Sequence, residues 1–204
     1  MTTGLKLLAE LAAQQPLSPQ CDHFYFLRHG QTACNARRIF QATDEPLSEL
    51  GVQQAHQAAA ILAGEPVRSI LSSGVVRALT TAHTVSAPHG IAPRVVEGLR
   101  ERNFGALIGT SSAHIDWACE PENGETLPAF IDRSRAALDR ALAHPGPVLV
   151  VAHGGTLYVL AALLGVPIDL SVLGNAQPLR FERSGTTWRL KPLLQQVDGG
   201  AFLA

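Results

Sequence analysis

Short apolar runs alternate with amphipathic segments along the chain, and this alternation predicts strands and helices in turn. Residues 23–30 (HFYFLRHG) and 147–155 (PVLVVAHGG) are apolar runs that end in glycine. Such uniformly apolar runs are typical of strands covered on both faces in a parallel sheet. The other predicted strands cover residues 68–72, 93–97 and 178–193, the last as a hairpin that turns at Ser184-Gly185.

Helical periodicity separates these strands. Residues 5–15 form the first predicted helix, which Pro16 and Pro19 end. Ser48 is expected to start a second helix over residues 48–64, with an inner face made of Leu50, Ala55, Ala58, Ala59 and Leu62. Further helices are predicted over residues 75–86, 127–143 and 156–165.

Two segments lack a clear period. Residues 31–47 are polar and irregular, and residues 99–125, called the insert below, carry several glycines and a proline. A short helix is expected within the insert near residues 112–119, and inserts of this kind often border functional sites.

Strands that alternate with helices predict an α/β fold with three layers, α/β/α, and a largely parallel central sheet. We expect a single domain over residues 1–204, with residues 1–20 as an N-terminal helical extension and the insert near the active site.

Composition excludes several classes of protein. Hydrophobic residues make up 46% of the chain and charged residues 16%, which is not the composition of a disordered chain. The net charge of −1 gives no reason to expect a nucleic-acid or membrane partner. The N-terminus lacks the features of a signal peptide, and no apolar stretch approaches the ~18 residues of a membrane-spanning helix.

The cysteines indicate the compartment in which the protein is expected. Cys21, Cys34 and Cys119 are scattered and lack C-x-x-C spacing, so they indicate neither a disulfide framework nor a zinc site. A reducing compartment, the cytoplasm, is therefore expected. Cys34 lies near the first glycine-ended strand, but the C-x₅-R pattern of cysteine phosphatases is absent, because Phe40 stands six residues later.

Two predicted strands end alike. The first ends in Arg28-His29-Gly30 and the second in His153-Gly154. Ligands bind at the carboxyl ends of strands in parallel sheets, and glycine lets a substrate approach the backbone there. A lone histidine is usually structural, but two at equivalent strand ends indicate a shared site.

Arginines accompany these histidines. Arg28 directly precedes His29, and Arg77 lies in the first turn of the helix after strand 68–72. Guanidinium groups match phosphate oxygens, and the start of a helix favours an anion. A neutral imidazole can attack phosphorus while arginines offset the charge on its oxygens. No metal-ligand set or Walker loop is present, so we expect neither a metal nor another cofactor.

The motifs together resemble a known family. LRHGQTACN (residues 27–35) is similar to the R-H-G-[EQ]-T-x-x-N signature of the histidine phosphatase superfamily, the phosphoglycerate mutase-like proteins. Four further segments resemble motifs of the same family and occur in the same order along the chain: DEPLSELGVQQA, SSGVVRALTTA, LRERNFGALIG and VAHGG. The resemblance covers about residues 23–191 and implies a phosphoglycerate mutase-like fold. One departure is the glycine that follows the arginine-rich stretch in the family, where Gln41 or Ala42 stands here.

The resemblance also implies roles for individual residues. His29 would be the nucleophile that becomes phosphorylated, and Arg28, Arg77 and His153 would hold the phosphate with it. Glu101 would protonate the leaving group and then activate water.

Two further residues are implied near the phosphate. Asn35 would donate a hydrogen bond to the phosphoryl group. Thr32 would either contribute a hydroxyl or serve the turn. Trp117 and Trp188 are interpreted as packing anchors instead.

The expected activity is metal-independent hydrolysis of a phosphomonoester through phosphohistidine. Two alternatives stay open: phosphotransfer of the phosphoglycerate mutase type, and a catalytically silent protein that binds a phosphorylated ligand. The expected partner is a small phosphorylated metabolite. An exposed face of the N-terminal helix also leaves a homodimer open.

Overall fold

The computed structural model describes residues 3–193, so both ends of the predicted 1–204 domain, residues 1–2 and 194–204, lie outside the described residues. The described part is built on one six-stranded sheet in the order β3-β2-β4-β1-β5-β6. β3, β2, β4 and β1 run parallel, whereas β5 and β6 add antiparallel pairs, which confirms the predicted largely parallel sheet. The strands are β1 His23–Arg28, β2 Ser69–Ser72, β3 Arg94–Val95, β4 Val148–Ala152, β5 Pro178–Ser184 and β6 Thr187–Pro192.

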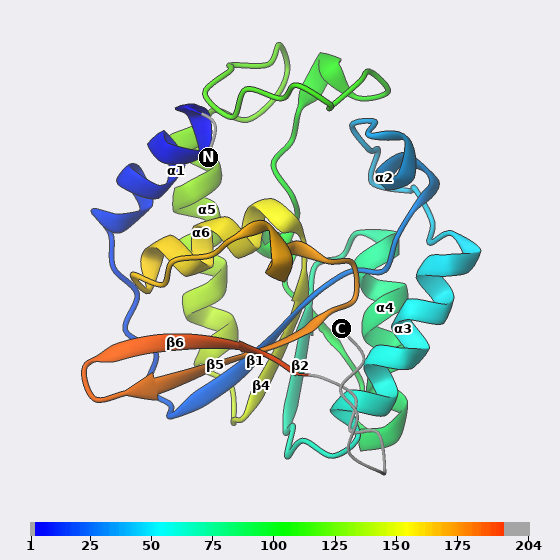
Figure 1. Ribbon diagram of the computed structural model, residues 1–204, viewed down its shortest axis with the longest axis vertical. Coiled ribbons are helices and arrows are strands. Elements are labelled where there is room, and N and C mark those ends of the chain that lie inside the picture. Colours follow the sequence, from blue (N-terminus) through cyan, green and yellow to red (C-terminus); the bar gives the residue numbers. More distant parts are fainter. Residues whose placement is uncertain (1–2, 194–204) are drawn as a thin grey trace.

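Helices cover both faces of the sheet (Figure 1). α1, α5 and α6 pack together on one face, and α3 and α4 pack together on the other. The predicted three layers are therefore present. The helices are α1 Thr3–Ala13, α2 Ala33–Arg37, α3 Glu49–Leu62, α4 Val76–Ser86, α5 Leu127–Leu142 and α6 Gly154–Leu163. In the described range, every helix is too short or too polar to cross a membrane.

The central strand β1 shows why the apolar run is uninterrupted. Phe24 and Phe26 point into the core shared with α1, α5 and α6, whereas Tyr25 and Leu27 point into the core shared with α3 and α4. All four side chains are fully buried. Burial of each contributes about 1.5–3 kcal/mol. A strand covered on both sides thus holds its carboxyl end rigidly at one edge of the sheet.

Helix α3 starts where the sequence predicts. The Ser48 hydroxyl accepts a hydrogen bond from the Gly51 N–H at 3.1 Å, which caps the helix. The expected inner position of Leu50 is wrong, because its side chain is 48% exposed. The other four predicted positions, Ala55, Ala58, Ala59 and Leu62, are buried as expected. Gly51 joins them on the inner face, where it approaches the backbone of the loop after β1 so closely that a Cβ would collide with it.

Several elements differ in extent from the predictions; α1 and α6, for example, each begin and end two residues earlier than expected. β3 has only two residues, because Glu97 already belongs to a 3₁₀ turn. The β5–β6 hairpin turns one residue later than expected, since Ser184 still pairs with Thr187. The irregular segment 31–47 contains the short helix α2, which Thr32 caps.

The predicted helix at residues 112–119 is wrong. This part of the insert consists of turns, and the only regular element inside the insert's described backbone is a 3₁₀ turn at Gly105–Leu107, preceded by another at Glu97–Leu99. The carbonyl groups of Trp117 and Cys119 accept hydrogen bonds from the Arg102 side chain rather than from helical N–H groups. A distant side chain therefore replaces the local ladder that a helix needs.

Candidate active site

The two strand-end histidines lie side by side. β1 and β4 are parallel neighbours in which Arg28 pairs with Ala152, so the next residues, His29 and His153, leave the sheet together. The His29 N–H donates to the Ala152 carbonyl at 3.0 Å. The two rings are 5.1 Å apart between centroids, at 61° to one another, and both side chains are buried. The structure thus brings together the two histidines that the sequence separates widely.

The hydrogen bonds of His29 define its tautomer. Nδ1 lies 2.7 Å from the Gly30 carbonyl oxygen, and since a carbonyl only accepts, Nδ1 carries the proton. Nε2 is left with its lone pair, which accepts from Nε of Arg77 at 3.3 Å. Burial, reinforced by the positive charges of Arg77 and Arg28, holds the pKa of His29 well below its usual range. His29 is therefore a neutral imidazole whose unprotonated nitrogen faces a guanidinium group.

The two arginines reach the histidines from different elements. Arg77 sits in the first turn of α4, where its Nη1 donates to the Ala42 carbonyl at 2.8 Å and only 4% of its surface is exposed. Arg28 ends β1 and donates from Nη1 to the Leu173 carbonyl at 2.6 Å. Its Nε is buried with no hydrogen-bond partner among the described residues. Burial lowers the pKa of both arginines, and the negative charge of Glu101 opposes this shift.

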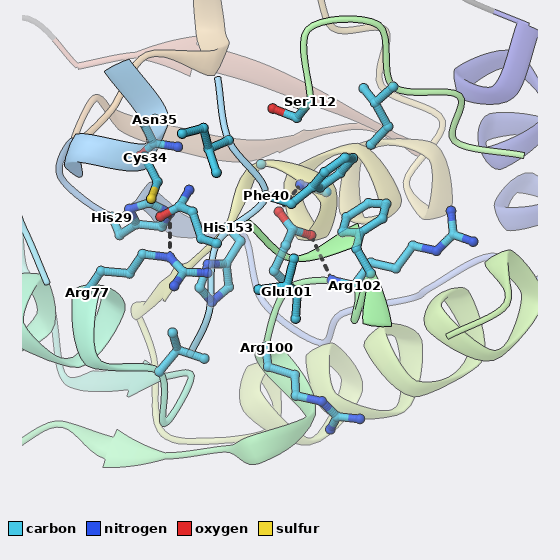
Figure 2. A pocket seen from close by; sticks show the side chains of 18 of the residues that line it. His29, Cys34, Asn35, Phe40, Arg77, Arg100, Glu101, Arg102, Ser112 and His153 are labelled. Atoms are coloured by element: carbon cyan, nitrogen blue, oxygen red, sulfur yellow. Dashed lines mark hydrogen bonds between the residues drawn. The ribbon is translucent and has the colours of Figure 1, made fainter. Parts of the chain in front are cut away.

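Four side chains therefore converge at the carboxyl edge of the sheet, and we call them the strand-exit cluster: Arg28, His29, Arg77 and His153. Figure 2 shows His29, Arg77 and His153 close together on one side of the pocket. Two cationic groups beside two neutral imidazoles form an environment that attracts an anion.

Ser73 completes the surroundings of His153 and was not assigned a role from the sequence, although it stands in the SSGVVRALTTA motif. Its hydroxyl lies 2.8 Å from Nε2 of His153, and Nδ1 of that ring is buried with no partner in the described part of the chain. Burial, then the nearby His29 and Arg77, lowers the pKa of His153 well below its usual range. If the hydroxyl donates to Nε2, Nδ1 is protonated and needs an acceptor, which an anion can supply.

Glu101 lies between this cluster and Arg102 of the insert (Figure 2). Its Oε2 accepts from the Gly155 N–H, in the first turn of α6, at 2.9 Å, and its Oε1 accepts from the Arg102 N–H at 3.0 Å. A Cβ on Gly155 would collide with Oε1, so this glycine makes room for the carboxyl group. The structure explains the second glycine of the VAHGG motif in this way.

The other two predicted site residues, Asn35 and Thr32, lie in different surroundings. Asn35 lines the pocket, and its Oδ1 accepts from the Thr32 N–H and from the side chain of Asn175, both at 3.3 Å. Its Nδ2 is left as a donor that takes part in neither of these two hydrogen bonds. Thr32 is fully buried outside the lining, where its hydroxyl caps α2 and donates to Oε1 of Gln41 at 2.8 Å. Of the two readings of Thr32, the structure supports the one in which it serves the turn.

The pocket is a cavity of about 660 Å³ between the strand exits and the insert. The strand-exit cluster and Asn35 form one side. Side chains from the insert and from α6 form a more apolar opposite side, among them Phe104, Ile108, Ile115, Trp117 and Tyr158. Cys34 also lines the pocket, and burial raises the pKa of its thiol, which opposes a thiolate. Across residues 3–193, no group of three or more His, Cys, Asp or Glu side chains is placed to hold a metal ion.

Two arginines that the sequence left without a role secure the insert. Arg102 is buried, with only 3% of its surface exposed. Its side chain donates hydrogen bonds to the carbonyl groups of Trp117, Cys119 and Glu125 at 2.5, 2.5 and 2.9 Å. Arg133 of α5 forms a bidentate pair with Glu125, with both distances 2.6 Å. It also donates to the backbone carbonyls of residues 98 and 100, directly before Glu101. These contacts fix the backbone that carries the pocket carboxylate.

Comparison with known proteins identifies the family. The model of the histidine phosphatase superfamily (branch 1) matches residues 24–194. Glucosyl-3-phosphoglycerate phosphatase of Mycolicibacterium vanbaalenii is 35% identical over 180 residues, which cover 74% of this chain and 79% of the relative. Probable phosphoglycerate mutase GpmB of Yersinia pestis is 34% identical over 167 residues, 70% of this chain and 75% of the relative.

One relative is longer, and a solved structure extends the comparison. The agropine synthesis reductase of Rhizobium rhizogenes is 33% identical over 191 residues, which cover 88% of this chain but only 43% of the relative's length. The structure of a mycobacterial glucosyl-3-phosphoglycerate phosphatase with VO3 superposes with a TM-score of 0.71 at 32% identity, over 84% of this chain and 98% of the other.

A fold with paired histidines at parallel strand exits, flanked by arginines, defines the class of phosphoryl-transfer proteins that use histidine. The chain belongs to the histidine phosphatase superfamily, branch 1. It is therefore an enzyme of the phosphatase or mutase type, as the motifs predicted.

Proposed function

We propose that the protein hydrolyses a phosphomonoester of a small metabolite in two steps, through a phosphohistidine at His29. The observation that carries this proposal is the tautomer of His29: its Nδ1 proton is held by the Gly30 carbonyl, so Nε2 is unprotonated and its lone pair can attack once Arg77 donates to a phosphoryl oxygen in place of Nε2. The contact of Nε2 with Arg77 marks where the phosphoryl group would enter.

In the first step, Nε2 of His29 forms a bond to phosphorus while the bond between phosphorus and the ester oxygen breaks. Arg28, Arg77 and His153 hold the non-bridging oxygens. Glu101, in its protonated form, gives its proton to the departing oxygen, so that an alcohol leaves rather than an alkoxide. Phosphoryl transfer asks mainly for positioning and charge stabilisation, which fits a site made of fixed arginines.

In the second step, the Glu101 carboxylate takes a proton from a water molecule, whose oxygen attacks phosphorus. The bond between phosphorus and Nε2 breaks, inorganic phosphate is released, and His29 returns to its neutral form. Glu101 is again protonated, ready for the next ester. Two hydrogen bonds from backbone N–H groups orient its carboxyl group throughout.

The similarity to glucosyl-3-phosphoglycerate phosphatase supports hydrolysis, and the cavity of about 660 Å³ is large enough for a phosphorylated metabolite. The similarity to a probable phosphoglycerate mutase supports a second candidate, in which the phosphoryl group on His29 passes to a sugar-acid hydroxyl instead of water. The two differ only in the acceptor of the second step.

The test is a panel of phosphomonoesters with release of phosphate as the readout, together with phosphoglycerate in the presence of a bisphosphate primer. Hydrolysis predicts free phosphate, whereas a mutase predicts isomer formation. Brief mixing with radiolabelled ester should give an acid-labile, base-stable label on the wild type and none on His29→Ala. Equal labelling of both proteins would overturn the mechanism, and binding of phosphate without turnover of any ester would favour a silent binding protein.

A further inference from the structure

The N-terminal helix α1 reaches the insert. Gly4, in its first turn, packs so closely on residues 116–118 that a Cβ added to it would lie 2.6 Å from the backbone nitrogens of Trp117 and Ala118. Figure 1 shows the start of α1 beside the green loops of the insert at one end of the molecule. Leu8 and Ala12 anchor the rest of the helix in the core that also contains Trp117. The family match begins only at residue 24, so α1 precedes it.

Trp117 connects this contact to the pocket. Its ring lies edge-on to Phe104, with centroids 5.7 Å apart, and it lines the cavity. A Cβ on Gly155 would lie 2.7 Å from Cη2 of Trp117 and would also collide with the Glu101 carboxyl group. The indole and the carboxyl group therefore share the narrow space over the first turn of α6, and a displacement of one affects the other.

Arg102 ties the same two residues together through the backbone. Its N–H donates to Oε1 of Glu101, and its Nη1 donates to the carbonyl of Trp117 at 2.5 Å. Trp117 is thus held by Arg102 on one side and by Gly4 on the other. Among these contacts, only the one from α1 comes from outside the segment matched to the family.

We propose that α1, through Gly4, positions Trp117 against Glu101 and so adjusts how the site handles the leaving group of its substrate. Gly4 is a positioning residue, since it does not itself line the pocket and reaches it only through residues 116–118. The proposal rests on the proposed function, in which Glu101 protonates the leaving oxygen. It assigns to the N-terminal helix a role in selecting esters by the size and basicity of the departing alcohol, with phosphate binding left to the strand-exit cluster.

The experiment compares Gly4→Ala with Gly64→Ala. Both changes add one methyl group, but nothing lies within 4 Å of the position that a Cβ would take at Gly64. For Gly4→Ala we expect kcat/KM to fall about threefold to tenfold on esters of bulky aliphatic alcohols, and less than twofold on p-nitrophenyl phosphate, because displaced protonation matters most for poor leaving groups. The inhibition constant of inorganic phosphate should stay unchanged. Gly64→Ala should behave as the wild type.

A second readout does not depend on turnover. The chain has two tryptophans, so a Trp188→Phe background leaves Trp117 as the sole indole emitter. Gly4→Ala should shift or quench this emission, and Gly64→Ala should not. If no ester is hydrolysed by any variant, the proposed function fails, while the emission still tests whether α1 positions Trp117.

A double-mutant cycle with Trp117→Phe separates positioning from general loosening. If α1 acts through the indole, Gly4→Ala should have little further effect on the leaving-group dependence once Trp117 is replaced. Fully additive effects, an unchanged emission, or an equal loss on all esters together with weaker phosphate inhibition would overturn the proposal. Should Gly4→Ala fail to fold, the single Trp117→Phe variant tests the same dependence.

Discussion

The two sides of the pocket are held in place by different means. The strand-exit cluster follows directly from buried strands and the first turn of α4, so the regular fold itself sets its geometry. On the opposite side, the insert is nearly devoid of regular structure in its described residues, and Arg102 and Arg133 hold its backbone carbonyls. The side proposed to bind phosphate, which every ester shares, is thus held rigidly by the strands of the sheet. The side proposed to meet the variable part of the substrate depends on a few side chains that can be replaced one at a time.

The largest effect is expected from Arg77→Ala, which removes one of the two arginines of the strand-exit cluster. We expect kcat/KM to fall by about 10²–10³ on all esters alike, because this arginine would stabilise charge on the phosphoryl oxygens that every substrate shares. Steady-state kinetics on good and poor leaving groups, together with phosphate inhibition, measure this. Arg68→Ala is the control, since Arg68 is exposed. A loss confined to poor leaving groups would contradict the division between the two sides.

Glu101→Gln tests the other side. Glutamine can still accept from the Gly155 N–H but cannot deliver a carboxyl proton, so kcat should fall by about 10² on alkyl phosphates and by less than about 10-fold on p-nitrophenyl phosphate. Glu120→Gln, an exposed carboxylate of the same insert, should leave both rates unchanged. An identical loss on both substrates would remove Glu101 from the role of proton donor.

Arg102→Ala should loosen the insert without disturbing the strand-exit cluster. It leaves three carbonyl groups without their donor, at a cost of about 2–4 kcal/mol in the free energy of unfolding. Urea denaturation measures this loss, and limited proteolysis should show faster cleavage within residues 103–125. Arg68→Ala again serves as the control. Unchanged stability with unchanged cleavage would mean that these contacts do not hold the insert.

The last prediction concerns pH. His29 and His153 have pKa values lowered by burial, so the unfolded chain binds more protons than the folded one once the pH falls below the ordinary value of about 6.5. Stability is therefore retained above that pH and lost below it, by up to about 1.4 kcal/mol per pH unit for each histidine. Denaturation curves between pH 5 and 8 should show a shallower loss for His29→Asn. An unchanged slope would mean that His29 does not titrate in this way.

Sequence patterns predicted the rigid side well. The apolar runs of β1 and β4 and the glycines after His29 and His153 are local signals, and parallel pairing brings their ends together without further information. Ser48 at the start of α3 is equally local. The error at Leu50 arose because a close approach to the loop after β1 makes Gly51 part of the inner face.

The insert was predicted less well, for a physical reason. The helix expected at residues 112–119 does not form because Arg102, distant along the chain, supplies the hydrogen bonds. Trp117 was interpreted only as a packing anchor, and it does pack in the core, but it also borders the pocket. Ser73 belongs to one of the sequence motifs, but only the fold shows that its hydroxyl lies within hydrogen-bond distance of His153. Contacts between distant segments leave no periodic trace in a sequence.

The two outer strands of the sheet have a consequence for assembly. An unpaired strand edge offers free N–H and C=O groups that can recruit a strand from another molecule and begin aggregation. Here β3 contributes only two residues to one edge, and β6 at the other carries Arg189, Lys191 and Pro192. Like charges repel a second copy, and proline lacks the donor that pairing needs. Both edges are therefore poor templates for intermolecular β-pairing, which protects a sheet whose interior strands are strongly apolar.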